Sequence, residues 1–180
     1  MKPGYDPMRM MFRSLLLGLA GAAAATFAAA QEDSSADGPL FGAWKIQCEA
    51  NAPCLAYVNL MNAESEQLAL TAAFYFIPGA EAPTAVMTFP LGVALKPGLR
   101  LRAEGLGEPI DLRPEVCYPD GCRAVANLTA GQAAALHQHE HFRVSFFVYG
   151  REAQPAALDV PADGLAAALA HLRATERAKD

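Results

Sequence analysis

Apolar and polar residues alternate with a period of two along much of the chain after residue 40, which predicts β-strands. Trp44, Ile46 and Cys48 fall on one face of the first such segment, and Lys45 and Gln47 fall on the other. Successive side chains of a strand point to opposite faces, so this pattern predicts one buried face. Further segments with strand character are separated by turns rich in Gly and Pro: residues 55–61, 68–77, 84–89, 93–95, 99–102, 110–116, 122–126, 142–149 and 157–160.

The period changes in two places, and each change predicts a short helix. Thr129, with a Gln three residues later, has the spacing of a capping box and begins the first. Leu165, Leu169 and Leu172 lie at i, i+4 and i+7, which gives one apolar face to a helix over residues 164–173. Many short strands with two small helices favour a mainly β protein with an antiparallel sandwich or barrel.

The chain divides into a short N-terminal segment and one domain. Residues 1–30 have the form of a secretory signal peptide: a start with three basic residues, an apolar run over residues 14–27 and small residues that predict cleavage after Ala30. The run is short and alanine-rich for a membrane span, and an uncleaved anchor is the alternative. We expect a flexible leader at 31–39, a single domain at 40–174 and a frayed tail at 175–180. No other stretch has the composition of a membrane span.

Net charge narrows the classes of partner. Removal of the signal takes three basic residues and one acidic residue from totals of 14 and 19, which leaves 11 and 18 and a net charge of −7. An acidic protein repels the phosphate backbone of nucleic acids and anionic lipid, so nucleic-acid binding is not expected.

Four cysteines follow the signal in two close pairs. Cys48 and Cys54 enclose five residues, and Cys117 and Cys122 enclose four. Exported cysteines meet an oxidising compartment, so an even number predicts disulfides. We favour pairing within each close pair, because a Pro-Asp-Gly turn brings the second two together. A four-cysteine zinc site and a redox-active pair are less favoured alternatives, since neither the usual zinc spacing nor Cys-x-x-Cys is present.

Two groups of polar residues, a run of histidines and a pair of arginines, could bind a ligand. His137, His139 and His141 would point to one side of an extended segment, where they could bind a metal ion, provided that the preceding helix ends before His137. A solvated connector is the preferred interpretation. Arg100 and Arg102 alternate with leucines, and we interpret them as the solvated face of a strand in preference to a binding patch.

The ordered motifs resemble the invasion-associated locus B family of exported bacterial proteins over about residues 40–172. The motifs that carry the resemblance are Phe41-Gly-Ala-Trp44, Cys48 with Cys54, Pro90-Leu91-Gly92-Val93, Cys117-x4-Cys122 with Gly121, and Pro-Ala-Asp-Gly164-Leu before the terminal helix. Leu165 departs from the family pattern, in which an aromatic residue is common after the glycine.

The resemblance implies an immunoglobulin-like antiparallel β-sandwich in the periplasm or envelope, with no known catalytic residues. It implies that Trp44 is a core residue and that the four cysteines form disulfides. We expect a non-enzymatic envelope protein that binds a protein partner, in the envelope or on a host cell, through an exposed sheet face or edge. No cofactor is expected, and the predicted location is the periplasm, with the outer surface or secretion as alternatives. The alternative function is a periplasmic metal-binding protein that uses the three histidines.

Overall fold

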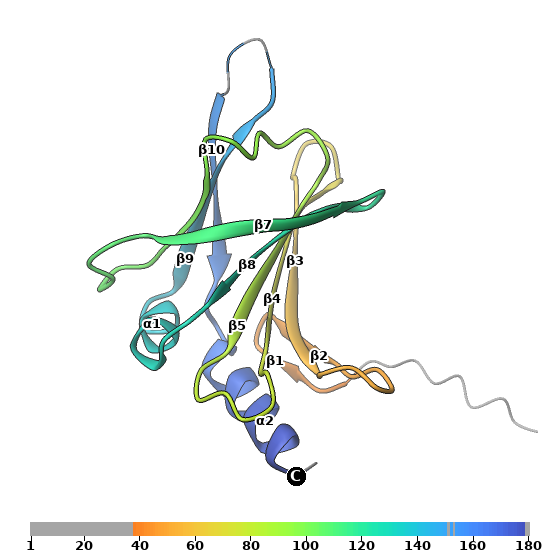
Figure 1. Cartoon of the computed structure of the whole chain (residues 1–180), viewed down its shortest axis with the longest axis vertical. Coiled ribbons are helices and arrows are strands. Elements are labelled where there is room, and N and C mark those ends of the chain that lie inside the picture. The colour runs from red at the N-terminus through yellow and green to blue at the C-terminus, as the bar shows by residue number, and fades with distance from the viewer. Residues whose placement is uncertain (1–37, 151, 153, 179–180) are drawn as a thin grey trace, which may run out of the picture. The chain divides into compact units, whose positions relative to one another are not determined.

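The computed structural model describes residues 38–150, 152 and 154–178, and these residues form a mainly β structure with two helices (Figure 1). The signal peptide predicted at 1–30 lies outside the described residues. The strands are β1 (Leu40–Phe41), β2 (Trp44–Gln47), β3 (Leu55–Met61), β4 (Leu68–Tyr75), β5 (Thr84–Phe89), β6 (Leu99–Arg102), β7 (Ile110–Tyr118), β8 (Gly121–Asn127), β9 (His141–Val148) and β10 (Gln154–Pro161). The helices are α1 (Ala130–Leu136) and α2 (Leu165–Arg177).

The ten strands pair in the order β1-β2-β3-β4-β5-β8-β7-β6-β9-β10, and every pairing is antiparallel. Strand β7 connects the two parts of this sheet. Its residues from Ile110 to Leu112 pair with β6, and those from Arg113 to Tyr118 pair with β8. The pairing with β8 shifts register between Pro114 and Val116. The predicted immunoglobulin-like sandwich is therefore not confirmed: the strands form one continuous, curled sheet, because a single strand changes partners along its length.

The inward side chains of the curled sheet make one core. Trp44 is fully buried, and its ring lies 5.3 Å from that of Phe74 and 6.4 Å from that of Phe142. These three aromatic residues come from β2, β4 and β9, so the cluster joins strands that are distant in the sheet order. The alternation in the sequence explains this placement, since every second residue of these strands faces inward.

Two short segments meet just before helix α2, and we call their contact the seam (residues 41–44 against 161–164). The Trp44 Nε1–H donates to the carbonyl oxygen of Pro161 at 3.0 Å, and the Ala43 N–H donates to that of Asp163 at 3.2 Å. Gly164 has φ +80°, and a Cβ atom there would collide with the carbonyl oxygen of Phe41. Only glycine allows both this backbone conformation and this approach.

Helix α2 begins directly after the seam and runs further than the sequence predicts. Its N-cap is Gly164, and it continues to Arg177, whereas the periodicity predicted an end near residue 173 and a frayed tail at 175–180. Arg173 donates to the carbonyl oxygen of Glu81 and lies 4.7 Å from the Phe76 ring, so the last turns have tertiary contacts that a sequence pattern does not reveal. The helix packs against β1 to β4.

The start of the domain also differs from expectation. Residues 38 and 39 belong to the predicted flexible leader, but the Gly38 N–H donates to the Ile46 carbonyl oxygen and the Ile46 N–H donates to that of Pro39, both at 3.0 Å. The chain is therefore held in place from residue 38. Within the described part of the chain, no helix has the length and apolar character needed to cross a membrane.

Candidate functional site

Both disulfides join the members of a close pair. Cys48 and Cys54 are bonded with an S–S distance of 2.08 Å, and Cys117 and Cys122 with one of 2.03 Å. Cys117 stands opposite Cys122 in the register of β7 and β8, just before a two-residue turn. The Pro-Asp-Gly sequence permits that turn, because Gly121 has φ +145° and its missing Cβ leaves room for the Phe89 carbonyl oxygen. The first disulfide closes the loop between β2 and β3, and the second closes the turn between β7 and β8. No free cysteine remains among the described residues.

The three histidines do not come together. His137 is the C-cap of α1, which removes it from the extended segment that metal binding would require. His139 lies in the connection after the helix, with its Nδ1 3.5 Å from the Glu104 carboxylate, and His141 is the first residue of β9. In residues 38–150, 152 and 154–178, no group of three or more His, Cys, Asp or Glu side chains could hold a metal ion. The alignment that the metal-binding alternative needs is thus not formed.

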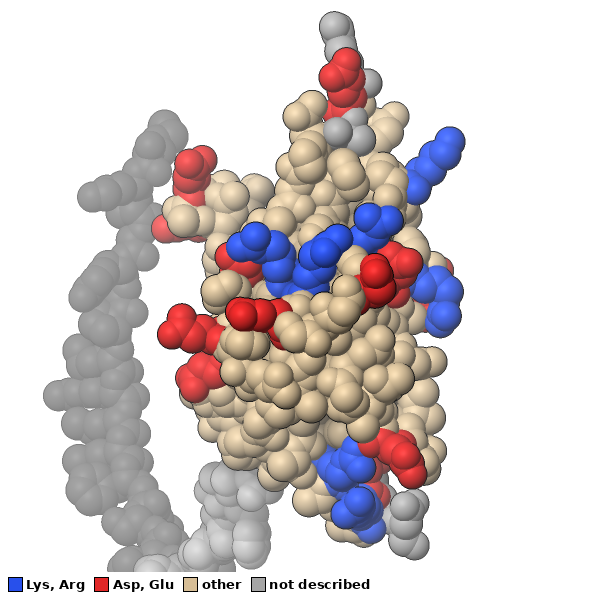
Figure 2. All heavy atoms as spheres, turned by 90° about the vertical axis from the view of Figure 1, so that its left-hand side faces the viewer, with Lys and Arg blue, Asp and Glu red and all other residues tan. Residues whose placement is uncertain are grey.

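A cavity of about 380 Å³ lies on the outer face of β6 and β9, and we call it the arginine cavity. The β6–β7 loop, residues 103–109, borders it on one side, and the segment from His139 to His141 borders it on the other. Arg102 of β6 and Arg143 of β9 line it as directly opposite residues in the antiparallel register. Glu104 and Glu108 of the loop complete its charged lining. Figure 2 shows the side of the molecule with β9 and β10, where basic side chains cross the middle with acidic ones beside them.

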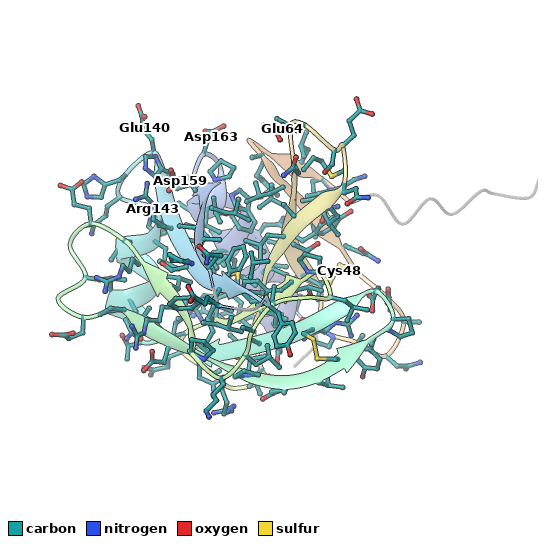
Figure 3. All side chains as sticks on the ribbon, turned by 90° about the horizontal axis from the view of Figure 1, so that it is seen from above. Cys48, Glu64, Glu140, Arg143, Asp159 and Asp163 are labelled. Atoms are coloured by element: carbon teal, nitrogen blue, oxygen red, sulfur yellow. A yellow bond between two sulfur atoms is a disulfide. The ribbon has the colours of Figure 1, made fainter. Side chains whose placement is uncertain are left out.

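The arginines on this outer face differ in their partners. Arg143 binds Asp159 of β10 through two hydrogen bonds, Nε to Oδ1 at 2.7 Å and Nη2 to Oδ2 at 2.9 Å, and Figure 3 shows the two side by side. This hydrogen bonding raises the pKa of Arg143 and lowers the pKa of Asp159, although partial desolvation of the carboxyl opposes the second shift. Arg100 pairs with Asp111 of β7 at 3.2 Å. Arg102 has no hydrogen bond or ion pair with any described residue.

A second surface lies at the other end of β9, and we call it the apolar rim (Leu91, Val148 and Tyr149). These side chains leave 61%, 46% and 77% of their surface exposed. Backbone contacts hold them together: Val93 forms a β-bridge with Val148, and the Tyr149 N–H donates to the Gly92 carbonyl oxygen at 2.7 Å. The rim lies at the end of β9 opposite to α2 (Figure 1).

Sequence reasoning missed the rim, and for Arg102 it predicted the exposed position but not the lack of a partner among the described residues. The sequence predicts a strand over residues 142–149, but Tyr149 lies just beyond the last residue of β9. The signal for the rim is the Pro-Leu-Gly sequence, which places an apolar side chain in a turn, where burial is not expected. Arg102 was interpreted as a solvated residue, and its isolation depends on strand register, which no local pattern encodes.

A continuous antiparallel sheet, a C-terminal helix beside the seam and two disulfides that close short loops make this a mainly β protein stabilised by disulfides. The family model described as "Invasion associated locus B (IalB) protein" matches residues 44–173. The chain therefore belongs to the invasion associated locus B family.

Comparison with solved structures supports the fold. The crystal structure of invasion associated protein B from Bartonella henselae is similar, with a TM-score of 0.68 and 20% sequence identity. The match covers 77% of this chain and 97% of that one. No curated protein matches the sequence.

Proposed function

We propose that this protein is an exported, non-enzymatic envelope protein of the invasion associated locus B family, and that it binds a protein partner through the apolar rim. The signal peptide predicted at residues 1–30 would direct it out of the cytoplasm, and the periplasm is the proposed location. The two disulfides support export, because such bonds persist in oxidising compartments.

The single observation that carries the binding role is the exposure of Tyr149 on a fixed backbone. Tyrosine supplies a large contact area with little side-chain entropy to lose, and it is enriched among residues that dominate binding energy. The β-bridge at Val148 and the hydrogen bond to Gly92 fix the backbone that carries these side chains before binding. The matching partner surface would be an apolar pocket that accepts an aromatic ring.

The sheet edges are less suited to a partner than the rim. Strand β1 offers two residues, and β10 has prolines at Pro155 and Pro161 among its eight positions. Proline cannot donate a backbone hydrogen bond, and prolines on edge strands discourage pairing with another strand. Of the two modes expected from the sequence, we therefore favour a side-chain surface over addition of a strand.

Site-specific photo-cross-linking in the bacterial envelope tests this role. A photoreactive residue at Tyr149 should give a discrete adduct with one partner, and Leu91→Asp should abolish it. The same residue at Tyr118, an exposed tyrosine on the disulfide hairpin, is the matched control and should give none. Equal adducts at both positions, or none at Tyr149, would contradict the proposal. An activity of the purified protein that a single polar substitution abolishes would contradict the non-enzymatic part.

The export step has its own measurement. The mass of protein isolated from the periplasm without reductant should correspond to a chain that starts at Gln31 and lacks four hydrogens, two for each disulfide. A chain that retains residues 1–30 and has free thiols would contradict the proposed location.

A further inference from the structure

The arginine cavity contains a charge arrangement that the fold does not need. Arg102 and Arg143 stand directly opposite each other on β6 and β9, and both side chains point away from the core. Like charges at such positions are destabilising, because their Cβ atoms lie within about 4.5–5.5 Å. Asp159 compensates Arg143, whose guanidinium already holds two hydrogen bonds, whereas Arg102 is left uncompensated.

Strand register explains why Arg102 is alone. Arg100, two residues earlier on the same face, meets Asp111 across β7. If this antiparallel register is continued by two residues, Arg102 lies opposite Pro109, which carries no charge. Glu104, the acidic residue that follows on the loop, faces His139 instead. The fold thus pairs Arg100 with an acidic residue, whereas Arg102 lines the cavity and has no acidic partner among the described residues.

The cavity fits a small ligand with an anionic group. Its volume of about 380 Å³ is at the lower end of the range for small-molecule sites. A free guanidinium presents donors in a planar fork that matches the oxygens of a carboxylate or a phosphate. Ala103, Leu106 and Pro109 add apolar lining beside this fork, against which the carbon part of a ligand could pack.

We propose that the arginine cavity binds a small oxyanion, a carboxylate or a phosphate group, with the guanidinium of Arg102 as its main donor. The bound oxygens neutralise the repulsion between Arg102 and Arg143. Glu108 on the loop limits the affinity, because it adds negative charge to the same cavity. This inference does not rest on the proposed protein-binding role, since the cavity and the apolar rim lie at opposite ends of β9.

The test is titration of the ¹⁵N-labelled, disulfide-bonded protein with sodium acetate and, separately, with inorganic phosphate at constant ionic strength. The chemical shifts of the Arg102 Nε–H and of the Leu101 and Ala103 amides should change saturably with at least one anion. The anion that reaches half-saturation at the lower concentration identifies the preferred oxyanion, carboxylate or phosphate. Shifts that rise without saturation for both anions would overturn the proposal.

Three variants sharpen the test. Arg102→Gln should abolish saturable binding, whereas Arg100→Gln, which removes the same charge from the paired neighbour outside the cavity, should change the midpoint little. Asp159→Asn removes a negative charge and releases the Arg143 fork, so it should tighten binding about fivefold. Unchanged binding in Arg102→Gln, or weaker binding in a folded Asp159→Asn, would overturn the assignment. The dispersion of the amide spectrum checks that each variant is folded.

Discussion

Inward and outward side chains alternate at the start of β9, and they belong to two regions, the core that adjoins the seam and the arginine cavity, whose polar groups are paired differently. Phe142 faces inward to Trp44, while Arg143 beside it faces outward to the cavity. On the inner side, each donor has its acceptor, and no buried side-chain nitrogen or oxygen among the described residues lacks a hydrogen-bond partner. On the outer side, Arg102 has no ion-pair partner in the part of the chain that the structure describes. The contrast separates residues that determine the fold from residues that remain available to a ligand.

The largest expected effect comes from Gly164→Ala, which attacks the seam directly. The new Cβ would meet the Phe41 carbonyl, and the residue would keep a positive φ of 80°. We expect the free energy of unfolding to fall by about 3–5 kcal/mol, from backbone strain and overpacking together. Urea unfolding of the oxidised protein measures it.

Gly79→Ala is the matched control, because Gly79 has φ +76° but nothing lies within 4 Å of its added Cβ. This variant should lower the free energy of unfolding by only about 1–2 kcal/mol, which is the part of the effect due to the positive φ. Equal losses in the two variants would show that the close approach at the seam does not contribute to stability.

A smaller effect is expected from Trp44→Phe, which keeps an aromatic ring in the core but removes the hydrogen bond to Pro161. We expect a loss of about 2 kcal/mol in the free energy of unfolding, from an unsatisfied carbonyl and lost volume. Phe74→Leu removes ring area from the same aromatic cluster without breaking a hydrogen bond, and it should lower the free energy of unfolding by about 1 kcal/mol. If Phe74→Leu were the more damaging, the hydrogen bond across the seam would be a minor contribution.

The sequence predicted local structure well, because local structure depends on local patterns. Alternation located most of the strands, and the capping box at Thr129 forms with both of its hydrogen bonds. The arrangement of the strands was less accessible. A periodic pattern shows which face of β7 is buried, but it does not reveal that the strand leaves β6 for β8 after Leu112. That change of partner makes the difference between one continuous sheet and the separate sheets of a sandwich.

The candidate sites were harder to predict, for two physical reasons. The three histidines share a spacing that suggests a metal site, but the sequence does not fix where α1 ends, and residues 137–140 form a turn after it instead of the extended segment that the alignment needs. Arg100 and Arg102 have the same local pattern, yet only one finds an acidic partner, because pairing depends on which residue of another strand lies opposite. Tertiary register, which is set by the whole sheet, decides the second case.

The smallest stability effects are expected on the outer face, where Asp159→Asn and Arg102→Gln should differ in sign. The pKa of Asp159 is lowered mainly by its hydrogen bond to Arg143, against a smaller opposing effect of desolvation, and the nearby charge of Arg143 lowers it further. A carboxyl group whose pKa falls on folding stabilises the folded state above its unfolded pKa, and this contribution is lost as the pH drops through the folded pKa. Asp159→Asn should therefore lower the unfolding midpoint slightly at pH 7, because the pair is solvent-exposed, and the difference from wild type should vanish in acid.

Arg102→Gln should leave the unfolding midpoint unchanged or raise it in low-salt buffer, because it removes a like charge opposite Arg143 without breaking a contact. Added salt should reduce any gain, since salt screens exposed charges. Chemical unfolding of both variants between pH 3 and pH 7 provides the comparison. A clear loss of stability in Arg102→Gln would mean that this arginine supports the fold, and the distinction between the two faces of β9 would fail. A stabilising substitution that also abolishes anion binding would show that Arg102 serves a ligand at the expense of the folded state, and a neutral one would show that it serves a ligand without contributing to the fold.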